Sequence, residues 1–149
     1  LALESLHIIL RRAAELAQCV CLENMFPRLG YMVDPAEFAP LFETYAELKL
    51  TLDLGHAFIG AKGPARILDF IQRFPDRLHH IHVSDNRGKQ DDHKPLGQGT
   101  LPYGEVLRTL AAIGYDETMT LEIFSSDRKH LAESRHKIEA LLPTVGGGE

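Results

Sequence analysis

Several features that mark other protein classes are missing from this chain of 149 residues. No apolar run approaches the roughly 20 residues needed to span a bilayer. No signal peptide opens the chain. The formal charge of −5 leaves no general basic surface for nucleic acid. These absences predict a cytoplasmic globular protein without a membrane or nucleic-acid partner.

Cysteine is scarce too, since the chain has only Cys19 and Cys21. On a strand, residues two apart share a face, so both side chains would point the same way as thiols. A disulfide between them is not expected, which agrees with a cytosolic protein. Because both precede the end of their strand, we interpret them as small packing residues rather than nucleophiles.

The composition that remains is typical of a globular domain, with 44% hydrophobic and 25% charged residues. Helical and strand patterns alternate along the chain. An apolar helical stripe comes first, formed by Leu3, Leu6, Leu10, Ala13 and Ala17. Strands are predicted at 19–24, 48–54, 78–85 and 118–124, and further helices at 35–46, 64–74, 102–113 and 127–142.

Three local features qualify this pattern. Pro40 inside the second predicted helix indicates a kink or a break. The polar segment 86–100 is long enough to be a functional loop. We expect one domain over residues 1–143 and a flexible tail over 144–149.

Strands that alternate with helices predict an α/β fold with a parallel sheet and right-handed crossovers. Two architectures fit this order: an open doubly wound sheet, or part of an eight-stranded barrel. No Gly-rich phosphate fingerprint follows any predicted strand. This absence disfavours the dinucleotide-binding form of the doubly wound sheet.

Each predicted strand has one oily face and one polar face, because successive side chains point to opposite sides. The polar faces carry Cys19, Cys21 and Glu23; Lys49, Thr51 and Asp53; His80 and His82; and Thr118, Thr120 and Glu122. On every strand, the polar face therefore ends in a side chain that can bind a metal.

In parallel α/β folds the carboxyl ends of the strands carry the active site. We therefore expect Glu23, Asp53, His82 and Glu122 to converge. Three carboxylates in one partly desolvated pocket would repel each other, and a divalent cation removes that conflict. An oxygen-rich set with one imidazole suits Mn²⁺, Mg²⁺, Co²⁺ or Zn²⁺.

A second set of candidates lies nearby. His56 follows Asp53 on the predicted loop that leaves the second strand, and Asp91 and His93 lie in the long polar loop. These three residues are candidates for a second metal site or for contacts with substrate hydroxyls and a phosphate. Lys49 faces the predicted interior, where it would pair with a carboxylate or touch substrate.

Residues after the third strand are further candidates. Asp85 and Arg87, in "SDNRG", are placed to orient a ligand, and Arg87 is carried forward as a substrate-binding candidate. His80 is interpreted as a structural residue that supports the site.

The segments "CLENM", "LDLGH", "HIHVSDN", "DDHKPLGQGTL" and "TLEIF" run in order from residue 19 to 124. Together they resemble the xylose-isomerase-like TIM-barrel superfamily, which includes sugar phosphate isomerases and epimerases and the AP endonuclease family 2 enzymes of the endonuclease IV type. The resemblance implies that Glu23, Asp53, His82 and Glu122 hold a divalent metal. In the epimerase-like branch it implies that the two glutamates are also the catalytic acid/base pair.

The two branches differ in what they imply for the second set. In the epimerase-like branch His56 matches a histidine that contacts substrate, and in the endonuclease branch His56, Asp91 and His93 match the ligands of an additional zinc. Two departures disfavour the endonuclease. "DLGH" lacks the usual Thr-Cys between Asp and His, and "HVSDNRG" lacks the usual Asn-Asp-(Ser/Ala)-Lys pattern.

The resemblance covers only the C-terminal half of a TIM (β/α)8 barrel, about four β/α units of a fold that needs about 250 residues. We therefore expect a homodimer, pairing with a missing N-terminal half, or a fragment of a longer protein. The leading hypothesis is an isomerase or epimerase of a small carbohydrate (sugar, sugar phosphate or polyol), with a dehydratase of a keto-inositol as a close variant. The alternatives are a zinc phosphodiesterase on abasic DNA and a non-catalytic assembly module.

Overall fold

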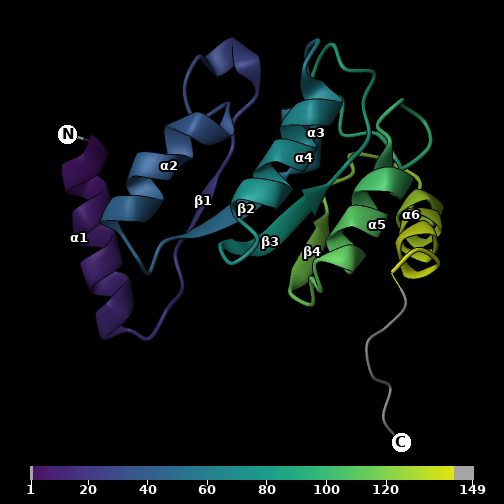
Figure 1. The fold of residues 1–149 in the computed structure, drawn as a ribbon. Coiled ribbons are helices and arrows are strands. Elements are labelled where there is room, and N and C mark those ends of the chain that lie inside the picture. The colour runs from purple at the N-terminus through teal and green to yellow at the C-terminus, as the bar shows by residue number, and fades with distance from the viewer. Residues whose placement is uncertain (1, 143–149) are drawn as a thin grey trace, which may run out of the picture.

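The computed structural model describes residues 2–142 and shows strands and helices in alternation (Figure 1). The strands are β1 (Cys21–Glu23), β2 (Lys49–Asp53), β3 (Leu78–Val83) and β4 (Thr118–Leu121). The helices are α1 (Ala2–Glu15), α2 (Pro35–Thr44), α3 (Leu54–Phe58), α4 (Gly63–Arg73), α5 (Tyr103–Ala112) and α6 (Lys129–Glu139), with a 3₁₀ turn at Pro27–Leu29.

The four strands form one parallel sheet in the order β1-β2-β3-β4. Each new strand is added on the same side of the one before it. That order is the order of a barrel, whereas a doubly wound sheet reverses its strand order at a switch point. The structure therefore decides between the two predicted architectures in favour of a partial barrel, with its helices gathered on one face of the sheet (Figure 1).

The core lies between the sheet and those helices. Leu50 and Leu52 of β2 and Ile81 of β3 are fully buried and pack in one cluster with Phe38 of α2 and Phe70 of α4. The rings of Phe38 and Phe70 meet edge to face, with their centroids 5.2 Å apart. The oily strand faces predicted from the alternation are therefore the faces that the helices cover, and the polar faces look the other way.

Helix α2 continues through Pro40, so of the predicted kink or break the break is wrong. The carbonyl that loses its partner belongs to Ala36, which is exposed at the first turn of the helix and is open to water. At the start of this helix the carboxylate of Glu37 accepts hydrogen bonds from the backbone N–H groups of Met32, Val33 and Asp34. This contact caps the amino end of the helix.

The predicted strands are longer than the observed ones, since the first two begin one or two residues early and all four run past the observed ends at Glu23, Asp53, Val83 and Leu121. The leading helical stripe is only partly correct: Leu10 is buried, whereas Leu3 is exposed. Helix α1 also exposes Ile8 and Ile9, each by more than half. Residues 143–149, which include the predicted tail, lie outside the described part of the chain.

Strands β1 and β4 are the two edges of the sheet, each paired on one side only among the described strands. Thr118 and Thr120, on the polar face of β4, are exposed within residues 2–142.

None of the described helices has the length and hydropathy of a membrane span.

Candidate metal centre

The ends of all four strands meet around one imidazole. Nδ1 of His82 lies 3.4 Å from Oε1 of Glu23, 3.6 Å from Oδ2 of Asp53 and 3.4 Å from Oε2 of Glu122. Glu23 ends β1, Asp53 ends β2, His82 is the penultimate residue of β3, and Glu122 follows the last residue of β4. The structure thus brings together the four residues that were predicted to converge.

Parallel register explains this convergence. Asp53 is paired directly with His82, and His82 with Thr120, so the last residues of neighbouring strands stand at one level of the sheet. Glu122 extends the ladder by one more hydrogen bond, from its N–H to the carbonyl of Val83. The side-chain alternation then turns all four polar groups to the face that the helices leave uncovered.

Asn24 holds the first two strand ends together and was not singled out from the sequence. Its side chain is fully buried, donates to the carbonyl of Asp53 at 3.1 Å and accepts from the N–H of Asp53 at 2.7 Å. The carboxamide thus mimics a further strand residue where the regular pairing of β1 with β2 ends. Its position directly after Glu23 in "LEN" is the only signal that the sequence offers.

The geometry of Glu23, Asp53 and His82 fits a divalent ion, because their ligand atoms all lie within 4.8 Å of one another, and Glu122 approaches the same imidazole. Oδ2 of Asp53 and Nδ1 of His82 are buried and have no hydrogen-bond partner among the described residues. Buried polar atoms of this kind nearly always have a partner. Ligand atoms about 2.1 Å from one tetrahedral ion would lie about 3.4 Å from each other, close to the separations observed here.

In the absence of a metal, the same contacts determine the pKa values of His82, Asp53 and Glu122. The nearby carboxylates of Asp53 and Glu23 raise the pKa of His82 from 6.5 to about 10. Burial favours the neutral form of Asp53, but the contacts with His82 and His56 outweigh it and lower the pKa of Asp53. Burial and the neighbouring Asp53 raise the pKa of Glu122. A proton on His82 therefore occupies the centre of the carboxylates when no cation is present.

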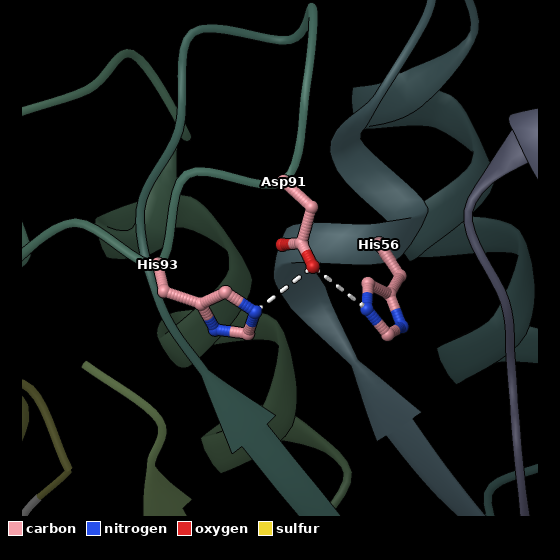
Figure 2. A group of neighbouring side chains, drawn as sticks. All are labelled: His56, Asp91 and His93. Carbon is pink, nitrogen blue, oxygen red and sulfur yellow. Dashed lines mark hydrogen bonds and ion pairs between the residues drawn. The ribbon is translucent and has the colours of Figure 1, made fainter. Parts of the chain in front are cut away.

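A second group lies beside the first. Oδ2 of Asp91 is 3.2 Å from Nε2 of His56 and 2.9 Å from Nε2 of His93, and Figure 2 shows both rings turned towards this carboxylate. His56 comes from helix α3, so its predicted place on a loop is wrong. Asp91 and His93 come from the long polar loop between β3 and α5, as predicted.

Backbone carbonyls decide the tautomers of both histidines. Nδ1 of His56 donates to the carbonyl of Asn24 at 3.0 Å, and Nδ1 of His93 donates to the carbonyl of Glu122 at 2.9 Å. In the neutral rings, both Nε2 lone pairs would then face the same carboxylate oxygen of Asp91. Such a meeting of lone pairs requires a proton or a cation between them.

In the absence of a metal, a proton on His56 meets this requirement. Burial alone would lower the pKa of His56, but Asp53, the Asn24 carbonyl and Asp91 outweigh it and raise that pKa. Oδ1 of Asp91 is another buried atom with no hydrogen-bond partner in the described chain. Two imidazoles and a carboxylate suit Zn²⁺ or another divalent transition metal, so this second group fits a metal as well.

Two of the remaining candidates lie outside these groups. Lys49 begins β2, about 13 Å along the strand from Asp53. Its Nζ donates to the carbonyl of Asp76 at 2.9 Å. The interior-facing lysine therefore lies at the amino end of the strand, away from the carboxylates gathered at its carboxyl end. Arg87 is exposed in the loop after β3.

His80 and the two cysteines were interpreted from the sequence as structural residues, and their contacts agree with that role. His80 contacts the hydroxyls of Thr118 at 2.6 Å and Thr120 at 3.0 Å, which agrees with a structural role. Cys19 and Cys21 are free thiols with sulfur atoms 3.9 Å apart. Burial and the neighbouring thiol raise the pKa of Cys21 to about 11, so it is a poor nucleophile at neutral pH.

Two phenylalanines border the histidines and were not identified from the sequence. The ring of Phe124 stacks on His93, with centroids 4.1 Å apart, and Phe26 packs on His56 at 5.3 Å. Phe124 is 73% exposed. An aromatic residue two positions after a glutamate at a strand end was the available signal.

A parallel α/β sheet whose strand ends gather carboxylates and imidazoles defines a barrel-type protein with a candidate metal centre. The family described as "Xylose isomerase-like TIM barrel" matches residues 1–143. The chain belongs to this family, as the resemblance of its motifs predicted.

Relatives and solved structures agree with this assignment. A D-tagatose 3-epimerase-like protein is similar in fold, with a TM-score of 0.79 and 24% identity over 95% of this chain and 53% of that chain. The TTHB071 protein of Thermus thermophilus, in a structure soaked with ZnCl₂, has a TM-score of 0.71 and 29% identity over 98% of this chain and 52% of that chain.

A curated relative is also named an epimerase. Fructoselysine 3-epimerase of Shigella flexneri is 27% identical over 81 residues, which are 52% of this chain and 29% of that protein. The chain spans between 25% and 49% of the length of the curated relatives it matches. The sheet of four parallel strands is therefore consistent with half of the family's barrel.

Proposed function

We propose that the chain carries the metal-binding half of a divalent-metal-dependent isomerase or epimerase that acts on a small sugar, sugar phosphate or polyol. The observation that carries the proposal is the placement of two glutamates, Glu23 and Glu122, which approach His82 from the two edge strands. Each has a carboxylate oxygen 3.4 Å from Nδ1 of His82. A substrate bound over His82 and Asp53 would therefore have a carboxylate on either side.

The proposed cofactor is one divalent ion, Mn²⁺, Mg²⁺, Co²⁺ or Zn²⁺, held by Glu23, Asp53, His82 and Glu122. When bound, it supplies Lewis-acid polarisation of a substrate carbonyl and so acidifies the neighbouring C–H group. Glu122 is suited to take up that proton, because its carboxylate reaches the centre from β4, the edge strand opposite that of Glu23. Glu23 then returns a proton from the opposite side, which inverts the carbon.

The comparisons support this proposal through what related proteins are named. Among the similar proteins are a 3-epimerase of fructoselysine and a D-tagatose 3-epimerase-like protein. His56, buried beside Asp53, would contact a substrate hydroxyl through the ring that Phe26 supports. Phe124, next to His93, would give the sugar an apolar surface.

Replacing Glu122 with Gln tests the acid/base assignment in the protein that contains this chain. We expect epimerisation of D-tagatose, supplied with Mn²⁺, to slow by at least about 100-fold, because general acid/base groups contribute about 10²–10⁴-fold. Exchange of the substrate α-proton with deuterated solvent, followed by NMR, reports the same step. Glu133→Gln on α6, an exposed glutamate, is the matched control. A Glu122→Gln variant that retains near-full rate would refute the proposal.

The second metal-competent group favours one alternative. His56, Asp91 and His93 are close enough to share an ion, which an endonuclease IV-like zinc phosphodiesterase on abasic DNA would require. Metal counting separates the two functions: about one bound ion per complete barrel favours the isomerase, and three favour the endonuclease. A nicking assay on an abasic duplex tests the alternative directly.

The open edges of the sheet bear on partners. β1 and β4 each have one unpaired side among the described strands, and exposed edges of this kind are normally paired or covered. We propose that further strands complete the barrel, from a second copy or from an N-terminal half. A non-catalytic assembly module predicts no turnover even with metal supplied, and light scattering of the 149-residue chain reports whether it self-associates.

A further inference from the structure

Asp85 lies in the loop that follows β3 and is fully buried. Its Oδ2 accepts hydrogen bonds from the N–H of Gly97 at 2.8 Å and of Gly99 at 2.9 Å, and its Oδ1 accepts from the N–H of Leu101 at 3.0 Å. One carboxylate thus satisfies three backbone donors at the far end of the polar loop. Hydrogen bonds from amides to a carboxylate are among the stronger ones in proteins.

The backbone of Asp85 also holds the middle of the same loop. Its N–H donates to the carbonyl of Lys94, and its carbonyl accepts from the N–H of Lys94, both at 2.8 Å. Lys94 follows His93 directly. His93 has a φ of +47°, a left-handed conformation that costs a residue with a side chain free energy and persists only when its surroundings impose it.

The space around Asp85 is shaped to keep this contact close. A Cβ added to Gly99 would lie 2.2 Å from Oδ1 of Asp85 and 2.2 Å from the carbonyl oxygen of Asn86. Only a glycine therefore allows the loop backbone to approach the carboxylate this closely. No part of the Asp85 side chain is exposed to a ligand, so the sequence-based suggestion that it orients a ligand is replaced by a contact with the loop.

We propose that Asp85 is a positioning residue: its carboxylate folds residues 86–101 into the shape that presents Asp91 and His93 to His56. The inference rests on the proposed second metal group but not on the reaction. The residue acts through the loop, because the amides of Gly97, Gly99 and Leu101 follow the histidine and the Lys94 bridge fixes its immediate neighbour. In an Asp85→Asn chain, an NH₂ group would face these N–H donors in place of an oxygen.

Cobalt binding provides the test, because Co²⁺ reports each site by its absorption spectrum. The Co²⁺ absorption bands that are present in the starting chain and absent in a His93→Ala variant belong to the ion held by His56, Asp91 and His93. In Asp85→Asn we expect the affinity for this ion to fall at least about 10-fold, as for other residues that orient metal ligands. The affinity of the group around His82 should stay within about 3-fold of the starting chain, because Asp85 does not orient those ligands.

Asp92→Asn is the matched control, since it makes the same substitution in the same loop. Asp92 contacts Lys94 and Gln90 within the loop, but it does not bind the backbone N–H groups of residues 97–101. It should leave both cobalt affinities unchanged. Amide hydrogen exchange adds a second readout: Asp85→Asn should speed exchange at Gly97, Gly99 and Leu101, and Asp92→Asn should not.

Gly99→Ala decides the question if Asp85→Asn does not fold, because it keeps the carboxylate while the added Cβ forces the loop away from Asp85 and from the carbonyl of Asn86. The same selective loss of the second cobalt ion supports the proposal. Equal loss of both ions, or unchanged binding of the second ion, overturns it, as does a starting chain with no His93-dependent ion. None of these readouts needs turnover, so an inactive protein would refute the proposed epimerase without affecting this inference.

Discussion

Replacing Asn24 with Ala should destabilise the fold strongly although it removes only a few atoms. The side chain makes two hydrogen bonds with the backbone of Asp53 and is fully buried. Its loss would leave the N–H and the carbonyl of Asp53 without those partners in a place where water has little access. Asp53 itself is only 1% exposed.

The magnitude follows from the orphaned N–H and from the loss of one hydrogen bond at the carbonyl, which also begins helix α3. A buried backbone group left without a partner costs about 1–3 kcal/mol and a hydrogen bond contributes about 0.5–1.5 kcal/mol, so the expected loss in the free energy of unfolding is roughly 2–4 kcal/mol. For a chain of about 150 residues each kcal/mol lowers Tm by about 2–4 °C. A loss of about 3 kcal/mol therefore corresponds to a fall in Tm of roughly 6–12 °C.

Thermal unfolding of the metal-free chain, followed by circular dichroism at the helical band, measures this change. Gln18→Ala is the control, because Gln18 is an exposed amide whose side chain bonds to the nearby carbonyl of Leu16. It should change Tm by no more than about 2 °C. An Asn24→Ala chain with a Tm within about 2 °C of the starting chain would refute the assignment of Asn24 as the link between β1 and β2.

Two further predictions concern titrating groups. Because Asp53 and Glu23 raise the pKa of His82 from 6.5 to about 10, its contribution to metal-free stability is complete below about pH 6.5 and is lost as pH rises through about 10. Unfolding curves across this range should show the loss, and a His82→Gln chain that shows the same pH dependence would contradict it. Iodoacetamide at about pH 8 should alkylate the exposed Cys19 faster than Cys21, whose pKa is raised to about 11. Mass spectrometry of the two sites measures the ratio, and equal rates would contradict the assignment.

Side-chain alternation was enough to predict the strands and the main site. The four residues Glu23, Asp53, His82 and Glu122 share one face and one end because period-two alternation and parallel pairing leave little freedom. Burial of the opposite face against α2, α4 and α5 confirms the same parity. The sheet and its proposed metal ligands therefore follow from local pattern and general rules of α/β folds.

The parts that escaped prediction depend on contacts between segments far apart in the chain. Nothing local distinguishes Asn24 from a surface asparagine; only the pairing of β1 with β2 places its carboxamide against Asp53. The sequence likewise suggests that Asp85 orients a ligand, and only the fold shows that its carboxylate binds the backbone N–H groups of Gly97 and Gly99. Lys49 was correctly placed on the polar face, but parity alone cannot say which end of the strand reaches a substrate.

Proton and metal compete for the same positions in this site, and that competition explains how the metal-free chain tolerates its carboxylates. The raised pKa of His82 puts a positive charge among Glu23, Asp53 and Glu122, and the raised pKa of His56 does the same beside Asp91. A divalent ion at either group must displace that proton, because a metal binds the neutral imidazole. Metal binding should therefore release protons and tighten as pH rises towards the pKa of His82. The charge that balances the carboxylates would thus be supplied by a proton in one form and by a metal in the other.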